Sequence, residues 1–70
     1  MMPLTLTKPG ETAQIKKVGG KDELRRHLEN LGFVTGADVT MISQNGGNVI
    51  VNVKNARIAI SKEMANKIMV

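Results

Sequence analysis

Three apolar-polar alternations in the second half of the chain constrain its fold more than any other feature. Between them stand two short runs of turn-forming residues, Gln44–Asn48 and Lys54–Asn55. A period of two predicts strands with one buried face, and short turns between such strands predict hairpins. The sequence therefore predicts an antiparallel meander of three strands, whose apolar positions are Val39, Met41, Val49, Val51, Val53, Ile58 and Ile60.

An additional strand is expected before this meander. Leu4 and Leu6 mark an amphipathic start, and Pro9-Gly10 then forms a turn, because proline presets φ and glycine accepts positive φ. The alternation that follows predicts a strand over Thr12–Val18, which Gly19-Gly20 ends.

A helix is inserted between this first strand and the meander. Leu24, Leu28 and Leu31 recur at i, i+4 and i+7, which places them on one stripe of a helix running roughly from Asp22 to Leu31. Gly32 supplies the left-handed residue that commonly ends a helix. The leucine stripe is expected to cover one mouth of a sheet structure.

The last ten residues leave two alternatives. Ser61 is a suitable N-cap for one or two helical turns through Ala65. Ile68–Val70 is apolar enough to return as a last short strand, although the segment 62–70 could equally remain helical.

These elements add up to five strands and one helix in a single domain spanning residues 1–70. The core must be built from branched aliphatic side chains, because 18 residues are Val, Ile or Leu and Phe33 is the one aromatic residue. Small sheets hide their edges by closing on themselves. We therefore expect a mainly β fold, a small and partly open five-stranded barrel with the helix inserted after the first strand.

Composition argues for an intracellular protein that does not span a membrane. The chain lacks cysteine, so it has no disulfide and no thiolate metal site, and its start has no signal-peptide pattern. The longest apolar run is three residues, Val49–Val51, against about 20 for a membrane span. The net charge of +4 is spread along the chain and is typical of solubility rather than of a dedicated basic patch.

No catalytic constellation is present, so we expect no enzymatic activity. His27 stands one helical turn after Glu23, and this pair is a weak candidate for a metal site that would need further ligands from a second chain. Gly19-Gly20-Lys21 before a helix is a poor match to a phosphate-binding loop, because the acids that follow stand where phosphate would sit.

Recognition through aromatic side chains is also excluded. The chain has no Tyr or Trp, and Phe33 follows the helix-ending glycine, where an apolar residue usually packs back on the helix. What remains are strand edges, aliphatic surface and a basic face around Arg25, Arg26 and Arg57. This set favours a protein-interaction module.

The sequence resembles the ferrous iron transport protein A family, FeoA. Leu24–Gly36 matches the family's arginine, leucine, leucine-glycine and glycine pattern, and Leu4–Gly10 matches its leucine and proline-glycine start. Asn55–Ile60 is similar to its last third. Thr35 stands where the family often has proline, and the hairpin Gln44–Asn48 is shorter than usual.

The resemblance implies an SH3-like barrel that works in the bacterial cytoplasm, at the inner face of the membrane. There it would serve ferrous iron uptake by docking on the cytosolic part of the FeoB permease, which carries a GTPase domain, and by modulating permease assembly or the GTPase cycle. No nucleic acid partner and no cofactor are expected, beyond weak Fe²⁺ or Zn²⁺ binding. The membrane would be contacted only through the permease.

The expected contact surface is the exposed side of the helix with apolar residues at its rim. Its residues are Leu24, Arg25, Arg26, His27, Glu29 and Phe33. Two alternatives belong to other classes. One is a transition-metal-binding regulatory module like the C-terminal domain of metal-dependent repressors, using Glu23 and His27. The other is a nucleic-acid-binding small barrel, which the pI of about 9.9 favours.

Overall fold

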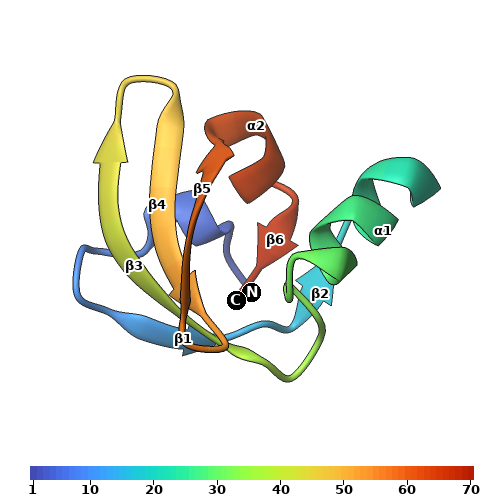
Figure 1. Ribbon diagram of the computed structural model, residues 1–70, viewed down its shortest axis with the longest axis horizontal. Helices are drawn as coiled ribbons and strands as arrows, with labels where there is room; N and C mark the ends of the chain where they lie inside the picture. Colours follow the sequence, from blue (N-terminus) through green and yellow to red (C-terminus); the bar gives the residue numbers. More distant parts are fainter.

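Six strands in two antiparallel sheets form the framework of the computed structural model, which describes residues 1–70 (Figure 1). One sheet has the order β1-β3-β4-β5 and the other pairs β2 with β6. Neither sheet closes on itself, so the expected mainly β, partly open barrel is confirmed. The elements are a 3₁₀ turn Leu4–Leu6, β1 Thr12–Gln14, β2 Lys17–Val18, α1 Asp22–Asn30, β3 Asp38–Asn45, β4 Asn48–Val53, β5 Ala56–Ser61, α2 Lys62–Ala65 and β6 Ile68–Met69.

The predicted meander is confirmed as β3, β4 and β5. Asn45 pairs with Asn48, so the first hairpin turns on two glycines, and Val53 pairs with Ala56 across a second two-residue turn. In that second turn Lys54 and Asn55 both adopt positive φ, of 50° and 63°. Such turns have the twist that matches the flanking strands, so the hairpin keeps its register.

A bulge at Ile42 interrupts the alternation within β3. Met41 pairs with Val51 and Ser43 with Ile50, which leaves Ile42 as the extra residue. Beyond the bulge Gln44 pairs with the buried Val49 and therefore shares its face. The Gln44 amide is satisfied there because it donates a hydrogen bond of 2.7 Å to a backbone oxygen of the N-terminal segment.

The predicted first strand is divided between the two sheets. β1 pairs with β3, whereas β2 pairs with β6. Between them the Ile15 amide donates to the Ala37 carbonyl at 2.9 Å, and the next amide, of Lys16, donates to the Met69 carbonyl at 2.8 Å. The chain thus exchanges one partner strand for another within two residues. The domain consequently has six strands where the sequence predicted five.

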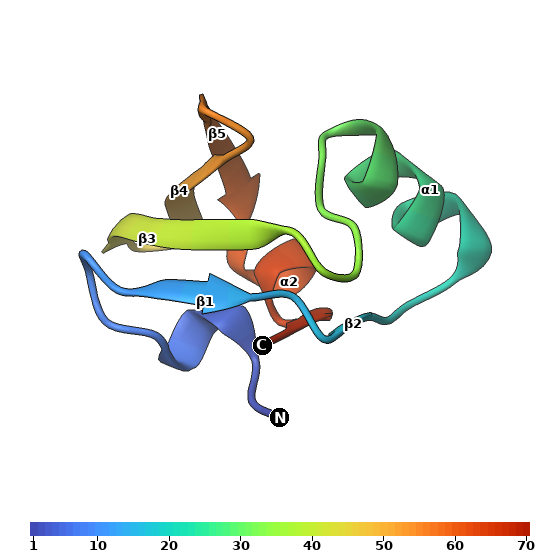
Figure 2. The same ribbon diagram turned by 90° about the horizontal axis from the view of Figure 1, so that it is seen from below.

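The C-terminal segment takes the strand alternative. The Ser61 hydroxyl accepts a hydrogen bond from the Met64 amide at 3.2 Å, which confirms it as the N-cap of α2. β6 then pairs with β2, and Met2 and Val70 exchange two backbone hydrogen bonds beyond it. The two ends of the chain therefore lie side by side (Figures 1 and 2).

One aliphatic core fills the space between the sheets and the helices. All strands except β1 supply buried side chains, and the loop after α1 adds the fully buried Phe33. No buried side-chain nitrogen or oxygen lacks a partner. The core consists of Leu4, Ile15, Val18, Leu28, Phe33, Val39, Met41, Val49, Val51, Val53, Ile60, Ala65 and Ile68.

Helix α1 stands beside the barrel (Figure 2). The predicted leucine stripe attaches it to the core. Leu28 is fully buried, while Leu24 and Leu31 pack against the rim of the core. The helix ends one residue before the expected end. Gly32 follows with φ of 109°, and the Phe33 amide returns to the Leu28 carbonyl at 2.9 Å, which closes the last turn.

This attachment predicts that Leu28→Ala destabilises the domain by about 2–5 kcal/mol, because it removes a fully buried side chain and leaves a cavity. Urea denaturation followed by circular dichroism measures the change. Leu6→Ala is the matched control, since Leu6 is 64% exposed and its truncation should change the free energy of unfolding by less than about 0.5 kcal/mol. Equal effects of the two variants would show that α1 is not held by this leucine.

Candidate functional site

The polar side of α1 divides into two flanks. Because a helix turns by about 100° per residue, Arg25 and Glu29 lie on the same flank as Asp22. Glu23 and His27 lie together on the opposite flank. The surface expected from the sequence is therefore two surfaces with different chemistry, separated by the leucine stripe on one side and by Arg26, which points outward, on the other.

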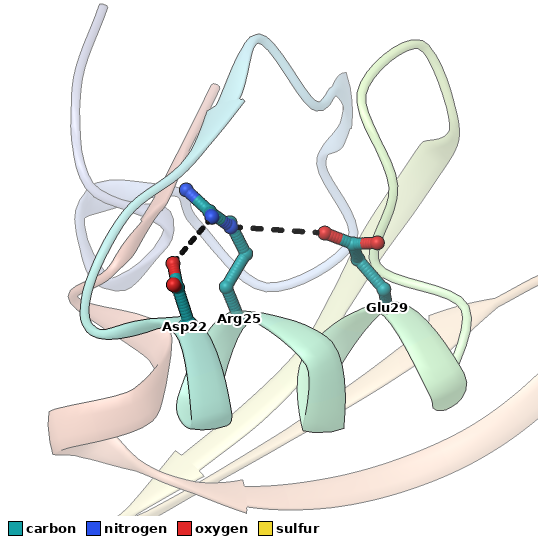
Figure 3. Close-up of polar contacts among 3 residues, drawn as sticks. All are labelled: Asp22, Arg25 and Glu29. Atoms are coloured by element: carbon teal, nitrogen blue, oxygen red, sulfur yellow. Dashed lines mark hydrogen bonds and ion pairs between the residues drawn. The ribbon is translucent and has the colours of Figure 1, made fainter.

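Arg25 is held between two carboxylates (Figure 3). One terminal nitrogen, Nη2, contacts Asp22 Oδ1 at 2.6 Å, and Nε lies 4.0 Å from Glu29 Oε1. The other terminal nitrogen has no contact with either acid (Figure 3). The Arg25 side chain is 46% exposed, so these pairs add little to stability and chiefly fix the direction of the guanidinium group.

A cleft of about 310 Å³ runs between this flank and β2. Arg25 and Glu29 border it from α1, and Lys16 and Lys17 border it from the other side. The remaining lining residues are Val18, Val34 and Thr35. The two lysines were not predicted as site residues, because they stood inside the predicted strand Thr12–Val18. The break in alternation could have identified them. Two consecutive charged residues cannot both be on the solvent face of a regular strand, so the pair indicates that the strand is interrupted there.

The two apolar residues expected at the rim have different positions. Phe33 is fully buried in the core, so its inclusion in the contact surface was wrong. The physical reason is the turn at Gly32, which directs Phe33 back beneath the helix. Leu24 is half-buried and borders a second hollow together with Gly20, Lys21 and Lys67, so it stays partly accessible to a partner.

The opposite flank carries the candidate metal ligands. Glu23 and His27 are both exposed and stand one turn apart. No group of three His, Cys, Asp or Glu side chains comes together anywhere in the chain. One copy of this protein therefore supplies at most two ligands at this position, and a closed site would need others from a second molecule.

The remaining polar surface belongs to the sheet. Arg57 on β5 pairs with Asn52 on β4, which places it on the outer face of the sheet and not on α1 with Arg25 and Arg26. A third hollow on that face contains one acid, Asp38, and one base, Lys54. Neither of these features gathers cations as the cleft beside β2 does.

Two further observations bear on function. Thr7 is the one buried polar side chain, and its hydroxyl donates to the Leu4 carbonyl at 2.6 Å, so no ionisable group is buried. No helix in the structure combines the length and the apolar character needed to cross a membrane.

Comparison with protein families gives a match over nearly the whole chain. The FeoA domain family matches residues 2–70. A protein of Methanocaldococcus jannaschii described as "Putative Fe(2+) transport protein A" is 34% identical over 70 residues, which are all of this chain and 85% of that protein.

Solved structures give the same fold. A crystal structure described as the iron uptake regulatory protein FeoA superposes with a TM-score of 0.91 at 27% identity, covering 99% of this chain and 93% of that one. A zinc complex of FeoA from Stenotrophomonas maltophilia, described as an SH3 domain protein, superposes with a TM-score of 0.87 at 28% identity. The superposition covers 100% of this chain and 89% of that one. A crystal structure of T. acidophilum IdeR superposes with a TM-score of 0.88 at 28% identity, covering 99% of this chain and 32% of that one. The expected SH3-like fold is thus confirmed.

The geometry around Arg25 predicts that Asp22→Asn frees its guanidinium group at small cost to stability. The expected change in the free energy of unfolding is about 1 kcal/mol or less, since the pair is exposed and the acid also sits at the positive end of the helix dipole. Nitrogen-15 relaxation of Arg25 Nε should report faster motion. Glu63→Gln, which removes an acid from the first turn of α2, should leave that relaxation unchanged. Unaltered Arg25 motion in Asp22→Asn would show that Asp22 does not fix the direction of the Arg25 guanidinium group.

Proposed function

The chain belongs to the FeoA family, and from this premise we propose that it is a non-enzymatic accessory protein of ferrous iron uptake. It docks on the cytosolic part of a FeoB-type permease and modulates the assembly or the GTPase cycle of that permease. The observation that carries the proposal is the family match over residues 2–70, supported by the likeness of the whole chain to a relative named for Fe²⁺ transport.

The structure supports α1 as the docking element. Both ion pairs of the protein lie within this helix, and its polar side chains make no hydrogen bond to the rest of the domain. Partner contacts there would disturb no polar interaction between α1 and the rest of the domain. The proposed surface is Leu24, Arg25, Arg26, His27 and Glu29, without Phe33.

The mode of action follows from the absence of a catalytic grouping. A small domain that binds a GTPase-bearing permease without performing chemistry acts by favouring one state of its partner. Under this proposal the protein works at the cytosolic face of the membrane and is held there by the permease alone.

The test is capture of the permease from solubilised membranes with this protein as bait. We expect capture by the wild type and loss of at least about tenfold with Arg25→Glu/Arg26→Glu, because two reversed charges at a docking surface repel what the native charges attract. Guanosine diphosphate and a non-hydrolysable guanosine triphosphate analogue are compared in parallel. Capture that depends on the nucleotide indicates a role in the GTPase cycle, and capture that ignores it indicates a structural subunit.

A control with the same change in net charge is Arg57→Glu/Lys62→Glu, on β5 and α2, which should capture the permease as the wild type does. Circular dichroism and thermal unfolding of both double variants exclude a folding defect. Equal capture by all three proteins would rule out the α1 surface. Failure of the wild type to capture the permease would contradict the proposed function.

A metal-binding regulatory role is a second candidate, favoured by the shared flank of Glu23 and His27 and by the zinc complex of the S. maltophilia relative. Two chains would each supply this pair to one ion. Calorimetry with Zn²⁺ and Fe²⁺ should then give a heat that His27→Ala abolishes, together with metal-dependent dimerisation in analytical ultracentrifugation. Equal heats for the two proteins would eliminate this candidate.

A further inference from the structure

We propose that the cleft between β2 and α1 receives an acidic side chain of the protein partner, so that a glutamate- or aspartate-containing segment of that partner docks beside Arg25, Lys16 and Lys17. This inference rests on the proposed function and deepens it, because it names the chemistry of the segment that the partner contributes. It extends the docking surface from α1 to Lys16 and Lys17 at β2.

The charges around the cleft are unbalanced toward the positive. Three cationic side chains line it, and Glu29 is the one acid in its lining. Lys16 and Lys17 take part in no ion pair, since both ion pairs of the protein involve Arg25. Glu29, the one acid of the lining, forms its ion pair with Arg25 at 4.0 Å and with neither lysine. The two lysines therefore remain available to an incoming anion.

Arg25 is prepared for such a contact before the partner arrives. Its Nε and Nη2 are directed by the two carboxylates of α1, whereas Nη1 is left without an ion-pair partner on a side chain that is 46% exposed (Figure 3). A cation whose rotamer is already fixed loses less conformational entropy on binding than a free one. The cleft thus has an oriented guanidinium group on the α1 side and two exposed, unpaired lysines on the other side.

The lining of the cleft favours a side chain over other anions. The chain has no Tyr or Trp, so the cleft offers no aromatic platform on which a base could stack. Val18 and Val34 contribute apolar surface beside the cations. An aliphatic stem that ends in a carboxylate matches both features, while inorganic phosphate would leave the apolar part unused.

The register of the strands explains why both lysines face outward. The partner exchange at Ile15 and Lys16 turns the chain, so that Ile15 and Val18 are buried while both lysines between them are exposed. A regular strand would have directed one of the two into the core. The cleft is thus a product of the same irregularity that joins the two sheets.

The experiment is a titration of the nitrogen-15-labelled protein, followed by amide chemical shifts, with a blocked peptide of sequence Gly-Glu-Glu-Glu-Glu-Gly. We expect shifts at Lys16, Lys17, Arg25 and Thr35, and an affinity that falls steeply between about 0.05 and 0.5 M salt because the contacts are screened. Lys16→Gln/Lys17→Gln should weaken binding about tenfold. The corresponding Gln peptide should produce no shifts in the cleft.

Control variants and probes separate this proposal from the alternatives. Lys8→Gln/Lys62→Gln removes the same charge at two lysines outside the cleft lining and should bind the Glu peptide as the wild type does. Inorganic phosphate or a mixed-sequence single-stranded oligonucleotide that binds the cleft as tightly as the Glu peptide would overturn the proposal, in favour of a small-anion or nucleic acid site. Cleft amides that do not respond to the Glu peptide would overturn it outright.

The same variants distinguish failure here from failure of the proposed function. If the wild type and Lys16→Gln/Lys17→Gln capture the permease equally, the docking function stands and the acidic contact is refuted. If the Glu peptide binds the cleft but no permease is captured, the cleft stands as a site for acidic segments and the permease as its partner is refuted.

Discussion

The change of partner strand at Ile15 and Lys16 is the interaction on which the rest of this structure depends. One amide bonds to the loop before β3 and the next to β6, so a single run of chain belongs to both sheets. The strand that this junction engages, β6, is followed by Val70, which exchanges two backbone hydrogen bonds with Met2. The junction also places two consecutive lysines on the surface next to α1.

Helix α1 is an addition to the barrel rather than a part of it. Its attachment depends on apolar contacts of three leucines, one of them fully buried, while its ion pairs join Arg25 to Asp22 and Glu29 of the same helix. The polar surface of this helix makes no side-chain hydrogen bond or ion pair to the rest of the domain. The core beneath it contains aliphatic side chains and one phenylalanine, and the chain has no Tyr or Trp.

Local sequence patterns were sufficient for most of the fold because each reports on neighbours along the chain. The valine alternation determined β4, the two short turns determined the hairpins, and the leucine spacing with Gly32 determined α1 and its end. The Ser61 cap could also be predicted, since the Ser61 hydroxyl accepts a hydrogen bond from an amide only three residues away. The exposed residues of α1 also followed from the helical period, which fixes the angle between side chains whatever surrounds them.

Features that depend on residues distant in the sequence could not be predicted from local patterns. The split of the first strand requires β6 and β3 as alternative partners, and periodicity carries no information about which strand lies alongside. The burial of Phe33 and the bulge at Ile42 depend on the core that forms around them. Local patterns along the chain were enough for the meander, for α1 and for the charged face of that helix. Lys16 and Lys17 line one cleft with Arg25 because of the way β2 and α1 pack on the common core. Burial of that core sets the relative position of these elements, and no local preference along the chain does so.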